Sequence, residues 1–189
     1  MRYNPHGPHW HKREDIPADI TLREYAEAWL DMAPHIGQLR DYAKYSTTIV
    51  EFGVRGGVST WALLDGMPSN GVLYGVDIDP DPPLPPRVRD DPRFRLVVGD
   101  AATVDLPVTS ADLVMIDASH EFVSTVKELE RAASLRPWHI LCHDYLYRET
   151  PQVKAAIDGY SMPGYLRDEP YKLIDVMKSN WGLAVLGPR

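Results

Sequence analysis

Five short apolar runs in this chain each end at an acidic residue or lead directly into one. Helical stretches lie between the runs, and this alternation is typical of a parallel α/β sheet. In such a sheet, ligands bind outside the carboxyl ends of the strands. The pattern therefore predicts a crevice lined by five carboxylates, which suits a polyhydroxylated cofactor or a metal ion. These residues are Glu51, Asp77, Asp100, Asp117 and Asp144.

The composition limits the class of protein. The chain has 189 residues, enough for one domain with a sizeable core. Its formal net charge of -7 makes a nucleic acid an unexpected partner. No apolar stretch approaches the roughly 20 residues that span a bilayer, and no signal-peptide core is present. We therefore expect a cytoplasmic protein without membrane contact, in which Cys142 forms no internal disulfide.

The first 20 residues differ from the rest of the chain. They contain three histidines and several prolines without periodicity, which predicts a mobile arm or lid, or else an adventitious metal-binding tract. From Thr21 the apolar spacing becomes helical, and Thr21 with Glu24 forms a capping-box pattern. Residues 21–189 are expected to form a single domain.

The strand signals predict a mainly parallel sheet that ends in a hairpin. The helix after the fourth strand buries one face, with Glu128 and Arg131 expected towards solvent. Five prolines between residues 80 and 86 exclude a regular helix longer than a turn there. A short turn containing Gly182 joins the last two strands as an antiparallel hairpin. The expected strands are residues 48–52, 72–76, 94–98, 113–116, 139–143, 171–177 and 183–186.

A glycine turn follows the first strand. Gly53, Gly56 and Gly57 let the backbone approach a ligand, and the next helix offers free N–H groups. Their spacing is not the G-x-G-x-x-G of dinucleotide sites. Because Glu51 would repel phosphates, the turn suits a cofactor that carries a cationic group.

The next two strand ends are candidates for nucleoside recognition. Asp77 is placed to accept hydrogen bonds from ribose hydroxyls, and Asp100 could accept from an exocyclic amine such as adenine N6. The alternative for both residues is a turn or capping role without a ligand.

Asp117, His143 and Asp144 end two strands expected to be adjacent, so their side chains could hold one divalent ion. Oxygen ligands suit Mg²⁺ or Mn²⁺, and His143 shifts the preference from Mg²⁺ towards Mn²⁺, Fe²⁺ or Zn²⁺. Alternatively, His143 only hydrogen-bonds the ligands, or no ion binds. His120 is the candidate general base, with Asp117 as the base if no ion binds. His120 could also be a capping or packing residue.

Tyr145, Tyr147 and Arg148 are candidate walls of the acceptor site, and Trp10 could lie nearby.

Several segments together resemble class I S-adenosylmethionine-dependent methyltransferases. They are E-F-G-V-R-G-G-V-S, G-V-D-I-D, V-V-G-D-A, M-I-D-A-S-H and C-H-D-Y. The nearest type is the small methyltransferase-24 group, which is related to macrocin- and sugar-type O-methyltransferases. The resemblance covers roughly residues 48–186. It implies a Rossmann-like, doubly wound sheet of seven strands in the order 3-2-1-4-5-7-6.

The resemblance also implies roles for individual residues. The expected cofactor contacts are Glu51, Gly53 and Gly57 around the methionine part, Ser59 at its carboxylate, Asp77 on the ribose, Asp100 with Ala101 at the adenine, and Asp117. It supports the metal site, because strand-end pairs of this type are ligands in metal-dependent O-methyltransferases. Arg55 departs from the family pattern, since it stands where the middle glycine is common, and it could alter the cofactor cleft.

We therefore expect a metal-assisted O-methyltransferase that acts on a small hydroxylated molecule, with a homo-oligomer as an open option. A hydroxylase-like enzyme and a non-catalytic S-adenosylmethionine-binding protein on the same fold are the alternatives. The glycine spacing disfavours a nicotinamide enzyme.

Overall fold

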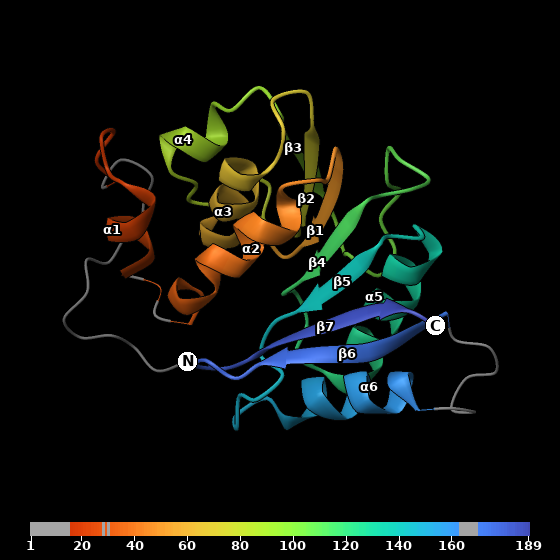
Figure 1. Cartoon of the computed structure of the whole chain (residues 1–189). Helices are drawn as coiled ribbons and strands as arrows, with labels where there is room; N and C mark the ends of the chain where they lie inside the picture. The colour runs from red at the N-terminus through yellow and green to blue at the C-terminus, as the bar shows by residue number, and fades with distance from the viewer. Residues whose placement is uncertain (1–15, 28, 30, 163–169) are drawn as a thin grey trace.

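The structure is a computed structural model that describes residues 16–27, 29, 31–162 and 170–189. Its sheet has seven strands in the order β3-β2-β1-β4-β5-β7-β6 (Figure 1). This is the order that the resemblance implies, and the expected terminal hairpin is present. The strands are β1 (Thr48–Phe52), β2 (Val72–Asp77), β3 (Phe94–Val98), β4 (Leu113–Ile116), β5 (His139–Cys142), β6 (Tyr171–Met177) and β7 (Leu183–Pro188).

Strand register brings the candidate residues to one edge. The first five strands are parallel, while β7 runs antiparallel to both β5 and β6. Phe52 of β1 pairs with Ile116 of β4, and Ile116 pairs with Cys142 of β5. The residues that follow these three positions therefore leave the sheet side by side.

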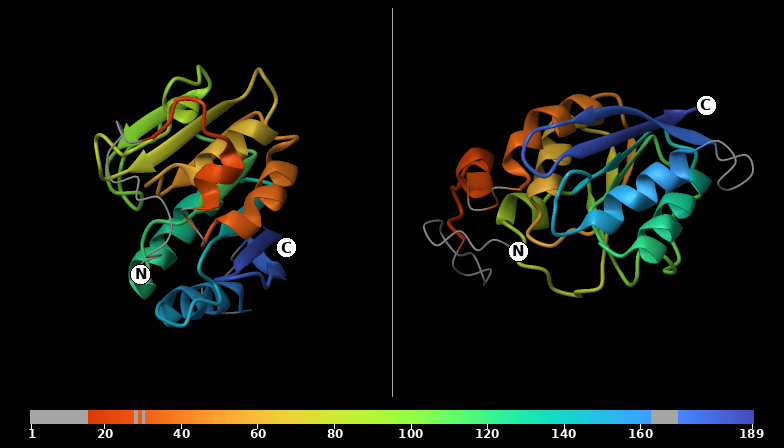
Figure 2. Two further views of the ribbon diagram at one scale, coloured as in Figure 1. Left: turned by 90° about the vertical axis from the view of Figure 1, so that its left-hand side faces the viewer. Right: turned by 90° about the horizontal axis from the view of Figure 1, so that it is seen from below.

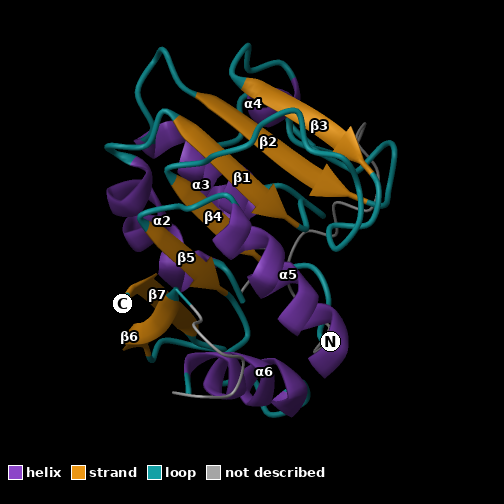
Figure 3. Ribbon diagram, turned by 90° about the vertical axis from the view of Figure 1, so that its right-hand side faces the viewer, coloured by secondary structure: helices purple, strands orange, loops and turns teal. Residues whose placement is uncertain are grey.

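Helices cover both faces of the sheet (Figures 2 and 3). Tyr25, Leu39 and Leu63 help to build a core between the first three α-helices and one face, while Leu129 and Ile157 belong to a second core beneath α5 and α6. The proline-rich crossover contains only a four-residue helix, as expected. The helices are α1 (Leu22–Glu27), the 3-10 helix η2 (Ala33–His35), α2 (Ile36–Ala43), α3 (Val58–Gly66), α4 (Pro86–Arg89), α5 (Phe122–Ser134) and α6 (Pro151–Ser161).

The start of the described chain is tied to the domain. The capping box is confirmed, because the Thr21 N–H donates to Glu24 at 2.9 Å and the Glu24 N–H donates to the Thr21 hydroxyl at 3.3 Å. Ile16 is buried against the first core. Residues 1–15 of the expected arm, including Trp10, lie outside the described residues. Within the part of the chain that is described, no helix has the length and apolarity needed to cross a membrane.

Candidate active site

The glycine turn is held by the end of the neighbouring strand. Asp77 Oδ2 accepts the N–H groups of Val54 at 2.9 Å and Arg55 at 2.8 Å, and Asp77 Oδ1 accepts that of Asp79 at 2.9 Å. Gly53 has a φ of +87°, and a Cβ placed there would lie 2.2 Å from the carbonyl oxygen of Asp117. Glycine is therefore required where the turn passes the end of β4.

Arg55 adopts the left-handed conformation that explains why a glycine is common at its position. Its φ is +48°, which costs a non-glycine residue about 1–2 kcal/mol. Its guanidinium lies 4.7 Å from the ring centre of Trp29 and 3.3 Å from the Asp31 carboxylate. The side chain thereby links the turn to the segment after α1.

Glu51 lies behind the turn and is fully buried. The Ser59 hydroxyl and the Thr60 hydroxyl, the latter at 2.7 Å, donate to its carboxylate. Burial raises the pKa of Glu51 from its ordinary value to about 8, against the opposing effect of these two hydrogen bonds. The site thus contains a buried carboxyl group for which a cation would be a favourable neighbour.

A cavity of about 440 Å³ opens at the carboxyl ends of β1, β2, β3 and β4. The structure brings six of the predicted site residues to its wall, namely Gly53, Asp77, Asp100, Ala101, Asp117 and His120. Gly57 and Ser59 line a separate space of only about 20 Å³, with Asp117 contributing to both. The predicted cofactor residues are therefore divided between a large cavity and a narrow space beside the glycine turn, and Glu51 is buried and lines neither.

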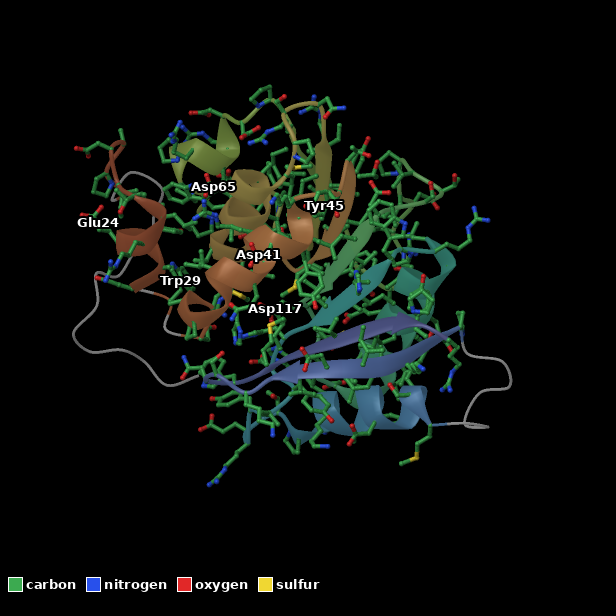
Figure 4. All side chains as sticks on the ribbon, viewed as in Figure 1. Glu24, Trp29, Asp41, Tyr45, Asp65 and Asp117 are labelled. Atoms are coloured by element: carbon green, nitrogen blue, oxygen red, sulfur yellow. The ribbon has the colours of Figure 1, made fainter. Side chains whose placement is uncertain are left out.

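Trp29, Asp31 and Met32 cover this narrow space. Trp29 and Asp117, both labelled in Figure 4, line the same small space although they are far apart in the sequence. Neither Trp29 nor Asp31 is among the residues that the sequence predicts for the site. The apolar spacing carries no signal that this segment would reach the glycine turn.

Two carboxylates and two imidazoles converge beside the cavity. His120 Nε2 lies 2.8 Å from Asp144 Oδ2 and 3.9 Å from Asp117 Oδ1. His143 Nδ1 lies 3.1 Å from Asp144 Oδ1 and 3.4 Å from Asp117 Oδ1. Ligand atoms of Asp117, His120 and Asp144 all lie within 4.8 Å of one another, a spacing that a metal ion could bridge. The structure thus unites the predicted ligands and adds His120 to them.

The charges in this cluster determine its protonation. The contacts with Asp117 and Asp144 raise the pKa of His120 to about 9. Burial by itself would lower the pKa of His143, but the same two carboxylates hold it well above its usual value. Burial opposes ionisation of both acids, yet the histidines lower the pKa of each. In the absence of an ion, His120 is therefore protonated at neutral pH, which disfavours it as a general base.

His143 is fixed from the opposite side. Its Nε2 lies 3.3 Å from the Asp31 carbonyl, which can only accept, so this nitrogen carries a proton. His143 Nδ1 and Asp144 Oδ1 are both buried and lie 3.1 Å from each other. Asp144 is also held at a φ of +62°. A buried lone pair facing two carboxylates requires a cation, which is either a proton or a metal ion.

Other residues differ from expectation. Tyr145 is buried, and its hydroxyl donates to Asp158 of α6 at 2.6 Å, so its side chain faces that helix. Tyr147 instead stacks on Trp181 with ring centres 4.0 Å apart, and Trp181 lies 6.2 Å from His143. The aromatic pair adjoins the cluster through a long-range contact that sequence spacing does not reveal.

The prediction that Glu128 faces solvent is wrong. Its side chain points into the protein, the residue is 2 % exposed, and it lines the main cavity. Charged residues normally occupy the outer face of an amphipathic helix, which made the expectation reasonable. Arg131 is half-buried, and its guanidinium donates to the Ala102 carbonyl at 3.4 Å.

Comparison with known proteins agrees with this architecture. A family model described as a methyltransferase domain (Methyltransf_24) matches residues 50–145. No curated protein sequence matches the chain. Among solved structures, the O-methyltransferase from Bacillus cereus in complex with SAH has a TM-score of 0.65 and 16% identity, over 92% of this chain and 93% of that chain. TomG from Streptomyces achromogenes, an O-methyltransferase in complex with SAM, has a TM-score of 0.62 and 14% identity, over 88% and 87%.

The sheet order and the glycine turn, together with the family match, define a class I S-adenosylmethionine-dependent methyltransferase. The chain belongs to the methyltransferase family whose model covers just over half of its length. At the identities above, the likeness to solved structures concerns the fold.

Proposed function

We propose that this chain is a metal-assisted O-methyltransferase that acts on a small hydroxylated molecule. The observation that carries the proposal is the position of Asp117 and His120, which belong both to the wall of the cofactor cavity and to the Asp/His cluster. A reactive group bound in the cavity would thus lie next to groups that handle a proton or a cation.

The cofactor side is supported by the position of Glu51. S-Adenosylmethionine carries an ammonium and a sulfonium, and a cation bound at the turn would favour the ionised form of the buried Glu51 carboxyl group behind it. Asp77 can bind the ribose while it holds the turn, because a carboxylate has about four lone-pair sites and three are used by backbone N–H groups. S-Adenosylmethionine would supply an electrophilic methyl when bound, so the protein has mainly to position the acceptor.

The metal side is supported by the donor set. The residues that would hold an ion are Asp117, Asp144 and His120, with His143 Nδ1 close enough to act as a further ligand. Mixed nitrogen and oxygen ligands favour Mn²⁺, Fe²⁺ or Zn²⁺ over Mg²⁺. An ion there would lower the pKa of an acceptor hydroxyl. Binding of an ion should release protons, because His120 and His143 carry protons in the ion-free chain.

The acceptor side of the proposal is supported by the cluster and the aromatic pair. Without an ion, Asp117 is the candidate to accept the hydroxyl proton, because it lines the cavity and His120 is already protonated. The stacked pair of Tyr147 and Trp181 offers an apolar surface next to His143. We propose a small molecule as the acceptor, in keeping with the net charge of -7, which disfavours a nucleic acid.

Asp144→Asn tests the proposal, with Asp105→Asn at an exposed loop position as the matched control. Mn²⁺ binding to chelator-treated protein is measured by titration calorimetry, and transfer from labelled S-adenosylmethionine is measured on a panel of hydroxylated acceptors. We expect Asp144→Asn to lose Mn²⁺ binding and methyl transfer but to keep S-adenosylhomocysteine binding. Metal-independent transfer would refute the role of the ion, and failure of the wild type to bind S-adenosylhomocysteine would refute the cofactor assignment.

A hydroxylase-like reaction is the second candidate. Two imidazoles beside carboxylates resemble the ligand set of non-haem iron oxygenases. Mass spectrometry of the product distinguishes the two reactions. This candidate consumes O₂ and a two-electron reductant, adds one oxygen atom to the product and releases the other as water, without the gain of a methyl group.

A further inference from the structure

Glu128 is a buried acid at the wall of the cofactor cavity. It lies on α5 and is 2 % exposed. Its Oε1 accepts the Ser119 N–H at 3.3 Å, whereas none of the described residues donates a hydrogen bond to Oε2. An unpaired buried acceptor is costly, and native proteins rarely keep one without a function. Because the residue lines the cavity, a ligand bound there would supply the missing donor once the Glu128 side chain turned Oε2 towards it.

The other two acids on the nucleoside side of the cavity are already engaged. Asp77 accepts three backbone N–H groups of the turn and the loop that follows. Asp100 is exposed, and its Oδ1 accepts the Ala102 N–H at 2.8 Å. A hydrogen bond from a ligand to exposed Asp100 would compete with water, whereas one to Glu128 Oε2 would replace nothing. Glu128 is therefore the stronger selector for a ligand donor.

The surrounding wall fits a flat heterocycle. Ala101, Ala118 and Ile78 contribute apolar surface to the same cavity, and Ile78 is 77% exposed at its rim. Ser119, whose N–H bonds to Glu128, follows Ala118 directly. A ring that packs against Ala101 and Ala118 would thus have an edge close to the Glu128 carboxyl.

We infer that Glu128 reads the nucleobase of the cofactor, with Oε2 accepting a hydrogen bond from the exocyclic amine of adenine. This reassigns to α5 the contact that the sequence predicted for Asp100. The inference rests on the S-adenosyl cofactor of the proposed function but is independent of the metal and the acceptor. An oxygen at the position of the amine would face Oε2 with a lone pair, so a hypoxanthine base would be rejected.

Binding of two nucleosides tests the inference. S-Adenosylhomocysteine and S-inosylhomocysteine differ at this edge of the base, and titration calorimetry measures their dissociation constants. The measurement is made at about pH 8, because burial raises the pKa of Glu128 to about 7 and its carboxyl is then mostly ionised. We expect the wild type to prefer the adenosyl ligand by roughly 10- to 100-fold, the range for a hydrogen bond to a charged group. Glu128→Gln should reduce the preference to within about threefold, because an amide can donate to oxygen or accept from an amine.

Glu130→Gln, an exposed position on the same helix, is the matched control and should keep the wild-type preference. Glu128→Ala, checked for folding by thermal unfolding, should also lose the preference and bind the adenosyl ligand more weakly. An unchanged preference in Glu128→Gln, with wild-type binding of S-adenosylhomocysteine, would overturn the inference and leave the proposed function intact. If the wild type binds neither nucleoside, both fall.

Discussion

Gly53→Ala should strongly destabilise the fold, because this glycine passes the backbone of a neighbouring strand end. The added Cβ would lie 2.2 Å from the carbonyl oxygen of Asp117, 2.6 Å from its carbonyl carbon and 2.8 Å from the Cα of Ala118. All three are backbone atoms, which cannot move aside as a side chain can. Overpacking typically costs about 1–3 kcal/mol. The φ of +87° adds about 1–2 kcal/mol for alanine.

The free energy of unfolding should therefore fall by roughly 2–5 kcal/mol, and Tm by roughly 5–15 °C for a domain of this size. Urea and thermal unfolding, followed by circular dichroism, measure both quantities. Gly37→Ala is the matched control, because it lies in α2 with nothing within 4 Å of the added Cβ. It should be neutral or stabilise by up to about 1 kcal/mol. A loss of under about 1 kcal/mol in Gly53→Ala would refute the close approach of the turn to β4.

Two further predictions concern the same turn. Arg55→Gly should be more stable than Arg55→Ala by about 1 kcal/mol in urea unfolding, because only glycine relieves the left-handed strain while both variants lose the Asp31 and Trp29 contacts; equal stabilities would contradict this account. Burial raises the pKa of Glu51 from 4.5 to about 8 in the folded chain, so Glu51 should lower the free energy of unfolding as the pH rises through this range. Over the same range the unfolded chain releases a proton that the folded chain keeps. Glu51→Gln should therefore gain stability relative to the wild type across this window, and a pH-independent difference between the two unfolding curves would show that Glu51 does not titrate there.

The sheet could be predicted in detail because each strand is a short apolar run with clear ends. Register then brings Asp117 and His143 together without further information, since both follow paired residues of β4 and β5. The sequence and the family resemblance accordingly placed Gly53, Asp77, Asp100 and Asp117 at one cavity and brought the Asp/His cluster together. Local patterns determine these features.

The parts that could not be predicted depend on long-range packing. Nothing in the spacing of α1 indicates that Trp29 reaches Arg55. Likewise, Glu128 has the sequence context of a surface residue, and its burial depends on how α5 packs over the cavity. The protonation of His120 depends on two carboxylates 24 and 3 residues away in the chain.

The narrow space beside the glycine turn has a consequence for ligand binding there. A space of about 20 Å³ holds only one or two water molecules, so a larger group could enter only if the segment of Trp29 and Asp31 shifted. The measured affinity would then equal the intrinsic affinity scaled by the fraction of molecules already open. Arg55 contacts both Trp29 and Asp31, so its side chain would stabilise the closed arrangement and weaken the binding of such a group.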